Sequence, residues 1–158
     1  MRRFVFLFVL ILLASCTAKP TETTSDAKEA PQTLIEFFAL LNAKKYAEAD
    51  ALYGGDYETL QNNNPDVAPS NHDKLLTNAC EMNGFQCLAV RSATLKHQEG
   101  DTYVFQVEFN NPDGSLFVLG PCCGANETEM PPVSQFEYTV TKNAEGKFVV
   151  MNLPPYVP

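Results

Sequence analysis

The spacing of apolar residues changes once along this chain, from a helical period to a period of two. In the first half apolar side chains recur every three or four positions, which predicts helices over residues 31–42, 44–53 and 73–80. After residue 84 apolar and polar side chains alternate, which predicts strands over residues 87–96, 103–109, 116–119, 136–140 and 147–153. Helices followed by hairpin-linked strands predict an α+β fold, with N-terminal helices packed on a curved antiparallel sheet of about five strands.

The apolar faces of these elements also predict the core. We expect the most buried side chains to be Phe37, Leu41, Phe105, Phe109, Phe136 and Val140. Glu108 and Glu137 alternate with these apolar residues and are expected to face solvent. The alternation changes phase between Val90 and Ala93, which predicts a β-bulge there.

The first residues have the pattern of an export signal. Arg2 and Arg3 precede an unbroken apolar run over residues 4–14, which is too short to span a membrane as a helix. The run ends in Leu-Ala-Ser-Cys, which resembles the bacterial lipobox. This resemblance implies cleavage before Cys16 and attachment of diacylglycerol to its sulfur.

These boundaries predict three segments. Residues 1–15 are a lipoprotein signal peptide, residues 16–30 are the lipidated cysteine and a flexible tether, and residues 31–158 are a single α+β domain. The tether is predicted because residues 17–30 hold no aromatic or large aliphatic side chain. The formal net charge of −8, made more negative by removal of Arg2 and Arg3, argues against nucleic acid as a partner.

The order of these elements carries a family resemblance. An aromatic first helix, Leu34-Ile35-Glu36-Phe37-Phe38, precedes Lys-Lys-Tyr-Ala-Glu-Ala at residues 44–49 and a strand-rich second half. From about residue 31 to residue 153 the chain resembles the nuclear transport factor two-like, or cystatin-like, superfamily, and more narrowly uncharacterised bacterial lipoproteins with one such domain. The resemblance implies a cone-like fold in which the sheet wraps a long helix around a pocket. Members include isomerases, dehydratases and non-catalytic binders, so the fold alone does not decide function.

Four cysteines remain besides Cys16, namely Cys80, Cys87, Cys122 and Cys123. An even number in an exported domain predicts two disulfides, with three pairings open. We expect Cys122 and Cys123 to reach separately to Cys80 and Cys87, because a bond between neighbouring residues strains a small ring. Their spacing fits a structural zinc site poorly, so we expect no metal.

The second predicted helix carries a candidate pocket, formed by Tyr46, Asp50 and Tyr53. Tyrosines at helical spacing are also typical of a core with solvated hydroxyls, and this interpretation stays open. His72 and His97 are interpreted as surface histidines. We expect no catalytic residue and no cofactor.

The sequence favours a membrane-anchored extracytoplasmic lipoprotein of the cell envelope. We expect a non-catalytic binding or scaffold module, whose partners are the membrane through its lipid anchor and an unknown small molecule or envelope protein. The alternative is an isomerase, dehydratase or hydrolase that uses the pocket of the cone. An open interior with converging polar groups would favour a ligand site, and an interior filled by aromatic side chains would favour a scaffold.

Overall fold

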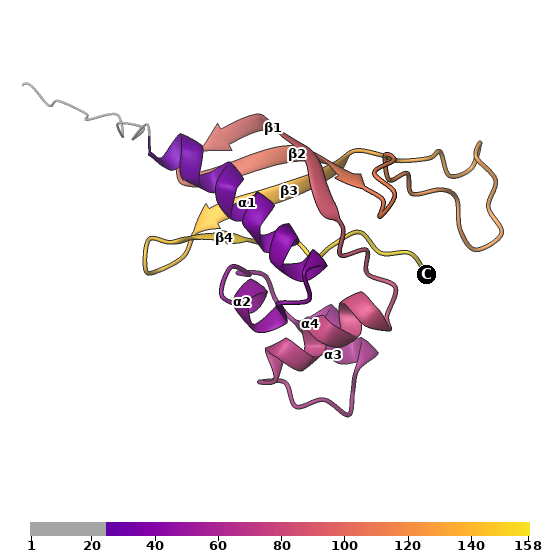
Figure 1. Ribbon diagram of the computed structural model, residues 1–158, viewed down its shortest axis with the longest axis horizontal. Helices are drawn as coiled ribbons and strands as arrows, with labels where there is room; N and C mark the ends of the chain where they lie inside the picture. Colours follow the sequence, from indigo (N-terminus) through magenta and orange to yellow (C-terminus); the bar gives the residue numbers. More distant parts are fainter. Residues whose placement is uncertain (1–24) are drawn as a thin grey trace, which may run out of the picture.

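The computed structural model describes residues 25–158, so the predicted signal peptide and Cys16 lie outside the described part. The elements in chain order are α1 (Asp26–Asn42), α2 (Tyr46–Asp50), α3 (Glu58–Asn63), α4 (His72–Glu81), β1 (Ala89–Glu99), β2 (Thr102–Asn110), β3 (Phe136–Lys142) and β4 (Phe148–Val150). The strands form one open antiparallel sheet in the order β1-β2-β3-β4. Helix α1 lies across one face of this sheet, and α2, α3 and α4 gather beyond its C-terminal end (Figure 1). The α+β class is confirmed, with four strands rather than five.

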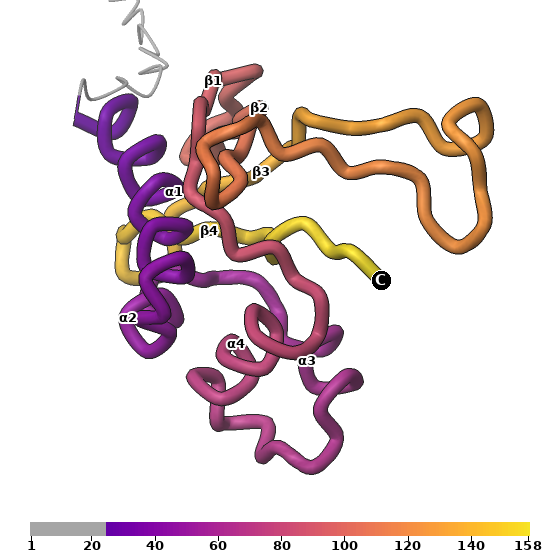
Figure 2. The backbone as a smooth tube through the Cα atoms, turned by 45° about the vertical axis from the view of Figure 1, so that its right-hand side comes forward, coloured from indigo at the N-terminus to yellow at the C-terminus, as the bar shows by residue number. Residues whose placement is uncertain are grey.

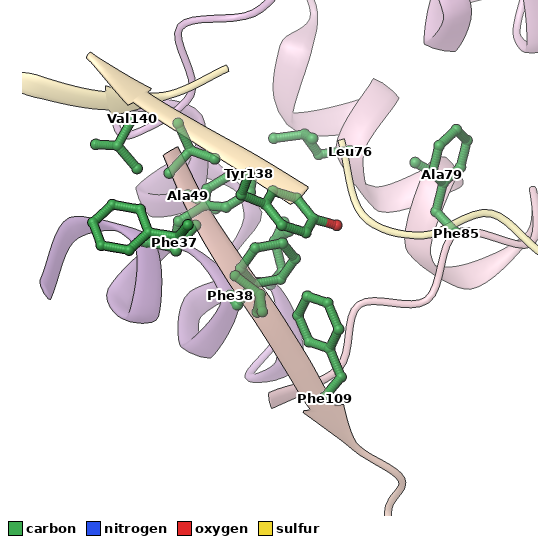
Figure 3. Close-up of a cluster of buried hydrophobic side chains, with 14 of the residues drawn as sticks. Phe37, Phe38, Ala49, Leu76, Ala79, Phe85, Phe109, Tyr138 and Val140 are labelled. Carbon is green, nitrogen blue, oxygen red and sulfur yellow. The ribbon is translucent and has the colours of Figure 1, made fainter. Parts of the chain in front are cut away.

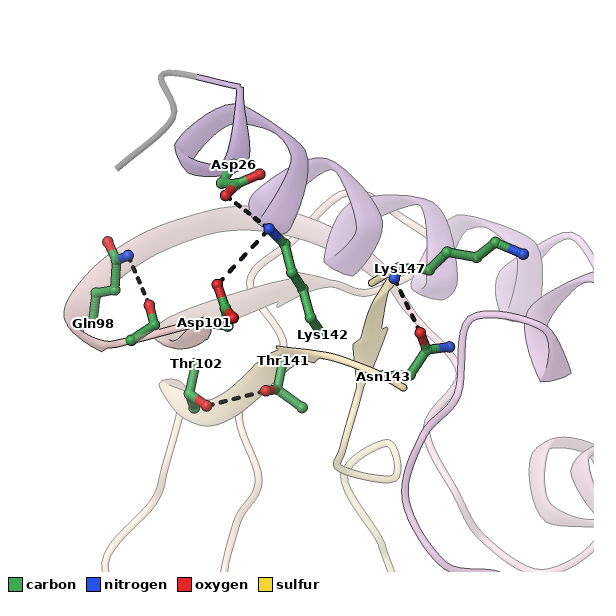
Figure 4. A network of polar contacts seen from close by, with 9 residues as sticks. Asp26, Gln98, Asp101, Thr102, Thr141, Lys142, Asn143 and Lys147 are labelled. Carbon is green, nitrogen blue, oxygen red and sulfur yellow. Dashed lines mark hydrogen bonds and ion pairs between the residues drawn. The ribbon is translucent and has the colours of Figure 1, made fainter. Parts of the chain in front are cut away.

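Helix α1 begins at Asp26 rather than at Pro31, which lies inside the helix. One face of α1 is buried and consists of Ala30, Thr33, Leu34, Phe37, Phe38 and Leu41. The first turn of α1 contacts a residue far along the chain, since the Lys142 ammonium lies 2.8 Å from the Asp26 carboxylate (Figure 4). The predicted tether over residues 16–30 is therefore wrong for residues 26–30, and residues 16–24 lie outside the described part.

The strands with the clearest alternation form as predicted. β2 pairs with β1 and β3, and the register of β1 shifts between Val90 and Ser92, which confirms the predicted bulge. Residues 116–119 do not form a fifth strand, because they make only isolated bridges from Leu116 to Asn110 and from Leu119 to Val133. The prolines at positions 121, 131 and 132 flank the second bridge and have no N–H with which to extend a ladder.

Aromatic side chains fill the space between α1 and the sheet (Figure 3). The Phe38 ring makes edge-to-face contacts with Phe37, Phe109 and Tyr138, with centroid distances of 5.2, 4.8 and 5.0 Å. Of the six residues predicted to be most buried, only Phe136 is incorrect, because it is partly exposed. Its ring stacks on Phe117, which comes from the connection between β2 and β3.

That connection, residues 111–135, projects away from the sheet and the helices (Figures 1 and 2).

The C-terminal tail, in contrast, packs against the domain. The Gln86 N–H donates to the Pro155 carbonyl at 2.7 Å, and the Val157 N–H donates to the Gly84 carbonyl at 3.0 Å. A Cβ at Gly84, whose φ is +80°, would lie 2.2 Å from the Val157 carbonyl oxygen, so only glycine allows this approach.

Candidate functional site

A groove with a volume of about 710 Å³ lies where the end of α1, the end of α4 and the segment before β1 meet. Its lining residues are Leu41, Asn42, Lys44, Tyr46, Cys80, Glu81, Met82, Gly84, Phe85, Gln86, Cys87 and Leu88. A smaller groove of about 350 Å³ shares Met82 and Gly84 with it and reaches the end of the C-terminal tail. Both volumes fall in the range of small-molecule sites.

One wall of the larger groove is set by the turn that ends α1. The Lys45 N–H donates to the Leu40 carbonyl at 2.9 Å and the Lys44 N–H to the Leu41 carbonyl at 3.0 Å, the pattern of a Schellman C-cap. Lys44 has a φ of +61°, a conformation that glycine usually supplies at this position. The turn therefore holds a strained lysine at the groove, and such backbone strain is concentrated at functional sites.

Glu81 is the residue of the groove that both Lys44 and Tyr46 contact. Its carboxylate accepts hydrogen bonds from the Lys44 ammonium at 3.2 Å and from the Tyr46 hydroxyl at 3.1 Å. These two donors, Lys44 foremost, hold the pKa of Glu81 below its usual range. Burial, reinforced by the bond to Glu81, raises the pKa of Tyr46 to about 12. At neutral pH the groove therefore presents a carboxylate, an ammonium and a neutral phenol side by side.

A disulfide joins two walls of the groove. Cys80 near the end of α4 bonds to Cys87 in the segment before β1, with their Cα atoms 5.5 Å apart. The expectation that Cys122 and Cys123 reach separately to Cys80 and Cys87 is therefore wrong. The chain reverses at Gly84 and brings Cys87 back to the end of α4, the helix that carries Cys80. Cys122 and Cys123, in contrast, lie together in the projecting connection.

Tyr46, Asp50 and Tyr53 do not converge on one pocket. Tyr46 lines the groove, whereas the Tyr53 hydroxyl donates to the Asp56 carbonyl at 2.9 Å. Asp50 accepts from the Tyr57 hydroxyl instead. These three residues have helical spacing, but each of them makes a different contact.

His72 has surroundings that its sequence neighbours do not indicate. Its Nδ1 atom lies 3.3 Å from an Asp50 carboxylate oxygen, and its ring stacks on Tyr57 with a centroid distance of 3.9 Å. Burial, followed by the bond to Asp50, raises the pKa of Tyr57, which keeps its hydroxyl a donor. The three residues come from α2, the start of α3 and the start of α4, so they tie these short helices together. No local pattern could have joined them.

Within residues 25–158 no cluster of three or more His, Cys, Asp or Glu side chains is arranged to hold a metal ion. The same range contains no helix that is both long and apolar enough to cross a membrane. Comparison with protein-family models, curated proteins and solved structures found no match to any of them.

Proposed function

We propose that this protein is an extracytoplasmic, lipid-anchored binding module with a nuclear transport factor two-like domain, whose ligand site is the larger groove. The observation that carries the proposal is the convergence of Lys44, Tyr46 and Glu81 in a groove of about 710 Å³. Apolar surface from Phe85 and Met82 lines the same groove. A few converging polar groups within partly apolar walls are typical of sites for small organic molecules.

The filled interior supports binding over catalysis. An isomerase or dehydratase that used the cone would need room between α1 and the sheet, where Phe37, Phe38 and Tyr138 are in ring contact. The groove lies outside this layer. The Asp50 carboxylate, the one acid of the pocket predicted from the sequence, is already engaged by Tyr57 and His72, which supports a structural role for it.

Blocking the groove is expected to remove its ligand. Met82 is 73% exposed and lines both grooves, so Met82→Trp adds bulk there without filling the core. A compound that copurifies with the wild-type chain, quantified by native mass spectrometry, should fall at least tenfold in Met82→Trp. Tyr46→Phe, which removes one hydrogen-bonding hydroxyl, should weaken binding about fivefold.

Met130→Trp is the matched control for this experiment. Met130 is 38% exposed, lies within the connection of residues 111–135 and lines neither groove, so the same substitution there should leave the bound compound unchanged. Equal amounts of compound in wild type and Met82→Trp, or no copurifying compound at all, would contradict the proposed site.

Removal of the lipidated cysteine is expected to release the protein from membranes. The lipobox implies that the anchor is attached to Cys16, so Cys16→Ser should appear in the soluble envelope fraction or keep its uncleaved signal. Fractionation and N-terminal mass analysis measure both outcomes. Cys123→Ser, a cysteine change outside the lipobox, should stay with the membrane. An unchanged membrane-bound fraction for Cys16→Ser would refute the anchor.

A further inference from the structure

Cys122 and Cys123 lie in a turn that directs neighbouring side chains to the same side. The Ala125 N–H donates to the Cys122 carbonyl at 3.0 Å, and φ is +60° at Cys123 and +90° at Gly124. These values correspond to a mirror-image, type I′ turn. In an extended chain neighbouring side chains point in opposite directions, whereas here the two sulfurs are 2.7 Å apart.

Hydrogen bonds on both sides hold this turn. Leu119 and Val133 exchange two backbone hydrogen bonds, of 2.8 and 2.9 Å, and thereby close the base of the loop. Just after the turn, the Asn126 side chain accepts from the Glu129 N–H at 3.1 Å, and the Glu129 carboxylate accepts from the Asn126 N–H at 3.1 Å. This reciprocal pair is a capping box, which fixes the chain beside the cysteines.

The pair is accessible as well as held. Cys123 is exposed and Cys122 is partly exposed. Both lie near the middle of residues 111–135, the connection that projects from the domain (Figure 2). Cys80 and Cys87 are already bonded to each other, so they are not partners for these two thiols.

We propose that Cys122 and Cys123 form an exchangeable thiol–disulfide site, which a disulfide compound oxidises to a bond between neighbouring residues and a dithiol compound reopens. In the forward direction the Cys123 thiolate attacks the disulfide compound, forms a mixed disulfide and releases one thiol. The Cys122 thiolate then attacks the Cys123 sulfur and releases the second thiol. One S–S bond forms, one breaks, and two electrons and two protons pass to the disulfide compound.

Two physical features favour this order and its reversal. The hydrogen bond between the two sulfurs, followed by desolvation, raises the pKa of Cys122, which leaves the exposed Cys123 as the first nucleophile. Neighbouring Cα atoms are about 3.8 Å apart, below the usual range of about 4.4–6.8 Å for a disulfide. Such a bond is strained and exposed, and disulfides of this kind are the ones that exchange readily.

The two cysteine pairs can be followed separately in one experiment. The full chain is equilibrated with glutathione and glutathione disulfide at a series of ratios, quenched in acid, alkylated and digested with trypsin. The digest places Cys80 and Cys87 together in residues 75–91, and Cys122 and Cys123 together in residues 97–142. The mass of each peptide therefore reports the state of one pair.

We expect residues 97–142 to be two hydrogens lighter under oxidising conditions and to take up two alkyl groups under milder reduction. Residues 75–91 should stay closed until the reducing ratio is at least tenfold higher. In Cys122→Ser a glutathione adduct should accumulate on Cys123. The proposal is overturned if residues 97–142 take up two alkyl groups at every ratio, if each cysteine carries its own glutathione, or if both pairs open together.

The turn itself is tested with two glycines of the same connection. Gly124 and Gly114 both have a positive φ and open space around them, so a side chain at either position meets no neighbour. Gly124→Val disfavours the turn that holds the sulfurs together and should make the pair at least threefold harder to oxidise. Gly114→Val should leave the oxidation unchanged, and equal effects of the two changes would show that the turn does not position the cysteines.

Discussion

Replacement of Phe38 by alanine is expected to lower the free energy of unfolding by about 3 to 5 kcal/mol. Phe38 is fully buried, and its ring touches Phe37 on its own helix, Phe109 on β2 and Tyr138 on β3. The substitution removes the central ring of the layer between α1 and the sheet. The surrounding rings come from three elements and cannot all move to close the cavity, so most of the lost contact is not recovered.

Ile35→Ala is the matched control for this measurement. Ile35 lies on the same helix but is 46% exposed, so its loss should cost less than about 1 kcal/mol. Urea titration of wild type and both variants measures the difference. Similar midpoints for Phe38→Ala and Ile35→Ala would show that α1 does not pack through its aromatic face.

Removal of the Cys80–Cys87 bond is expected to cost about 2.5 kcal/mol. The two cysteines are seven positions apart, and the chain-entropy model gives about this value for so small a loop. The measurement compares Cys80→Ala/Cys87→Ala with wild type by urea titration. The same variant should also weaken ligand binding, because the bond joins two walls of the larger groove.

Cys122→Ser is the control for the loss of a cysteine as such, because it leaves the Cys80–Cys87 bond intact. It should retain the bound compound and most of the stability. A double variant as stable as wild type would contradict a stabilising role for the bond between α4 and the segment before β1.

Local patterns predicted the parts of the fold that depend on local alternation. Phe109 of β2 and Tyr138 of β3 each contact the Phe38 ring of α1. Apolar and polar residues alternate from Tyr103 to Phe109 and from Phe136 to Val140. The start of α1 was not predicted because residues 26–30 have no large apolar side chain to show a helical period, and the ion pair between Asp26 and Lys142 joins positions 116 apart. The partial exposure of Phe136 was not predicted either, because Phe136 lies at the edge of the core, where its ring stacks on Phe117 from the connection between β2 and β3.

In the larger groove, too, the sequence predicted some of the residues but not their partners. Tyr46 was recognised from the second helix, but its partner Glu81 ends a different helix and shares no sequence pattern with it. Lys44 gave no signal either, because the left-handed turn that ends α1 usually carries glycine. The cysteine pairing was mispredicted because the reversal at Gly84 makes the short-range pair the reachable one.

The position of α1 against the sheet also determines when the domain can fold. Helix α1 is the first described element to be synthesised, yet it packs on β1, β3 and β4, which come later in the chain. Its aromatic face therefore stays only partly covered, by Tyr53 and α2, until synthesis has passed Val150. Contacts between distant parts of a chain close slowly. A nascent chain with this topology can complete the layer between α1 and the sheet only after its last strand has been made.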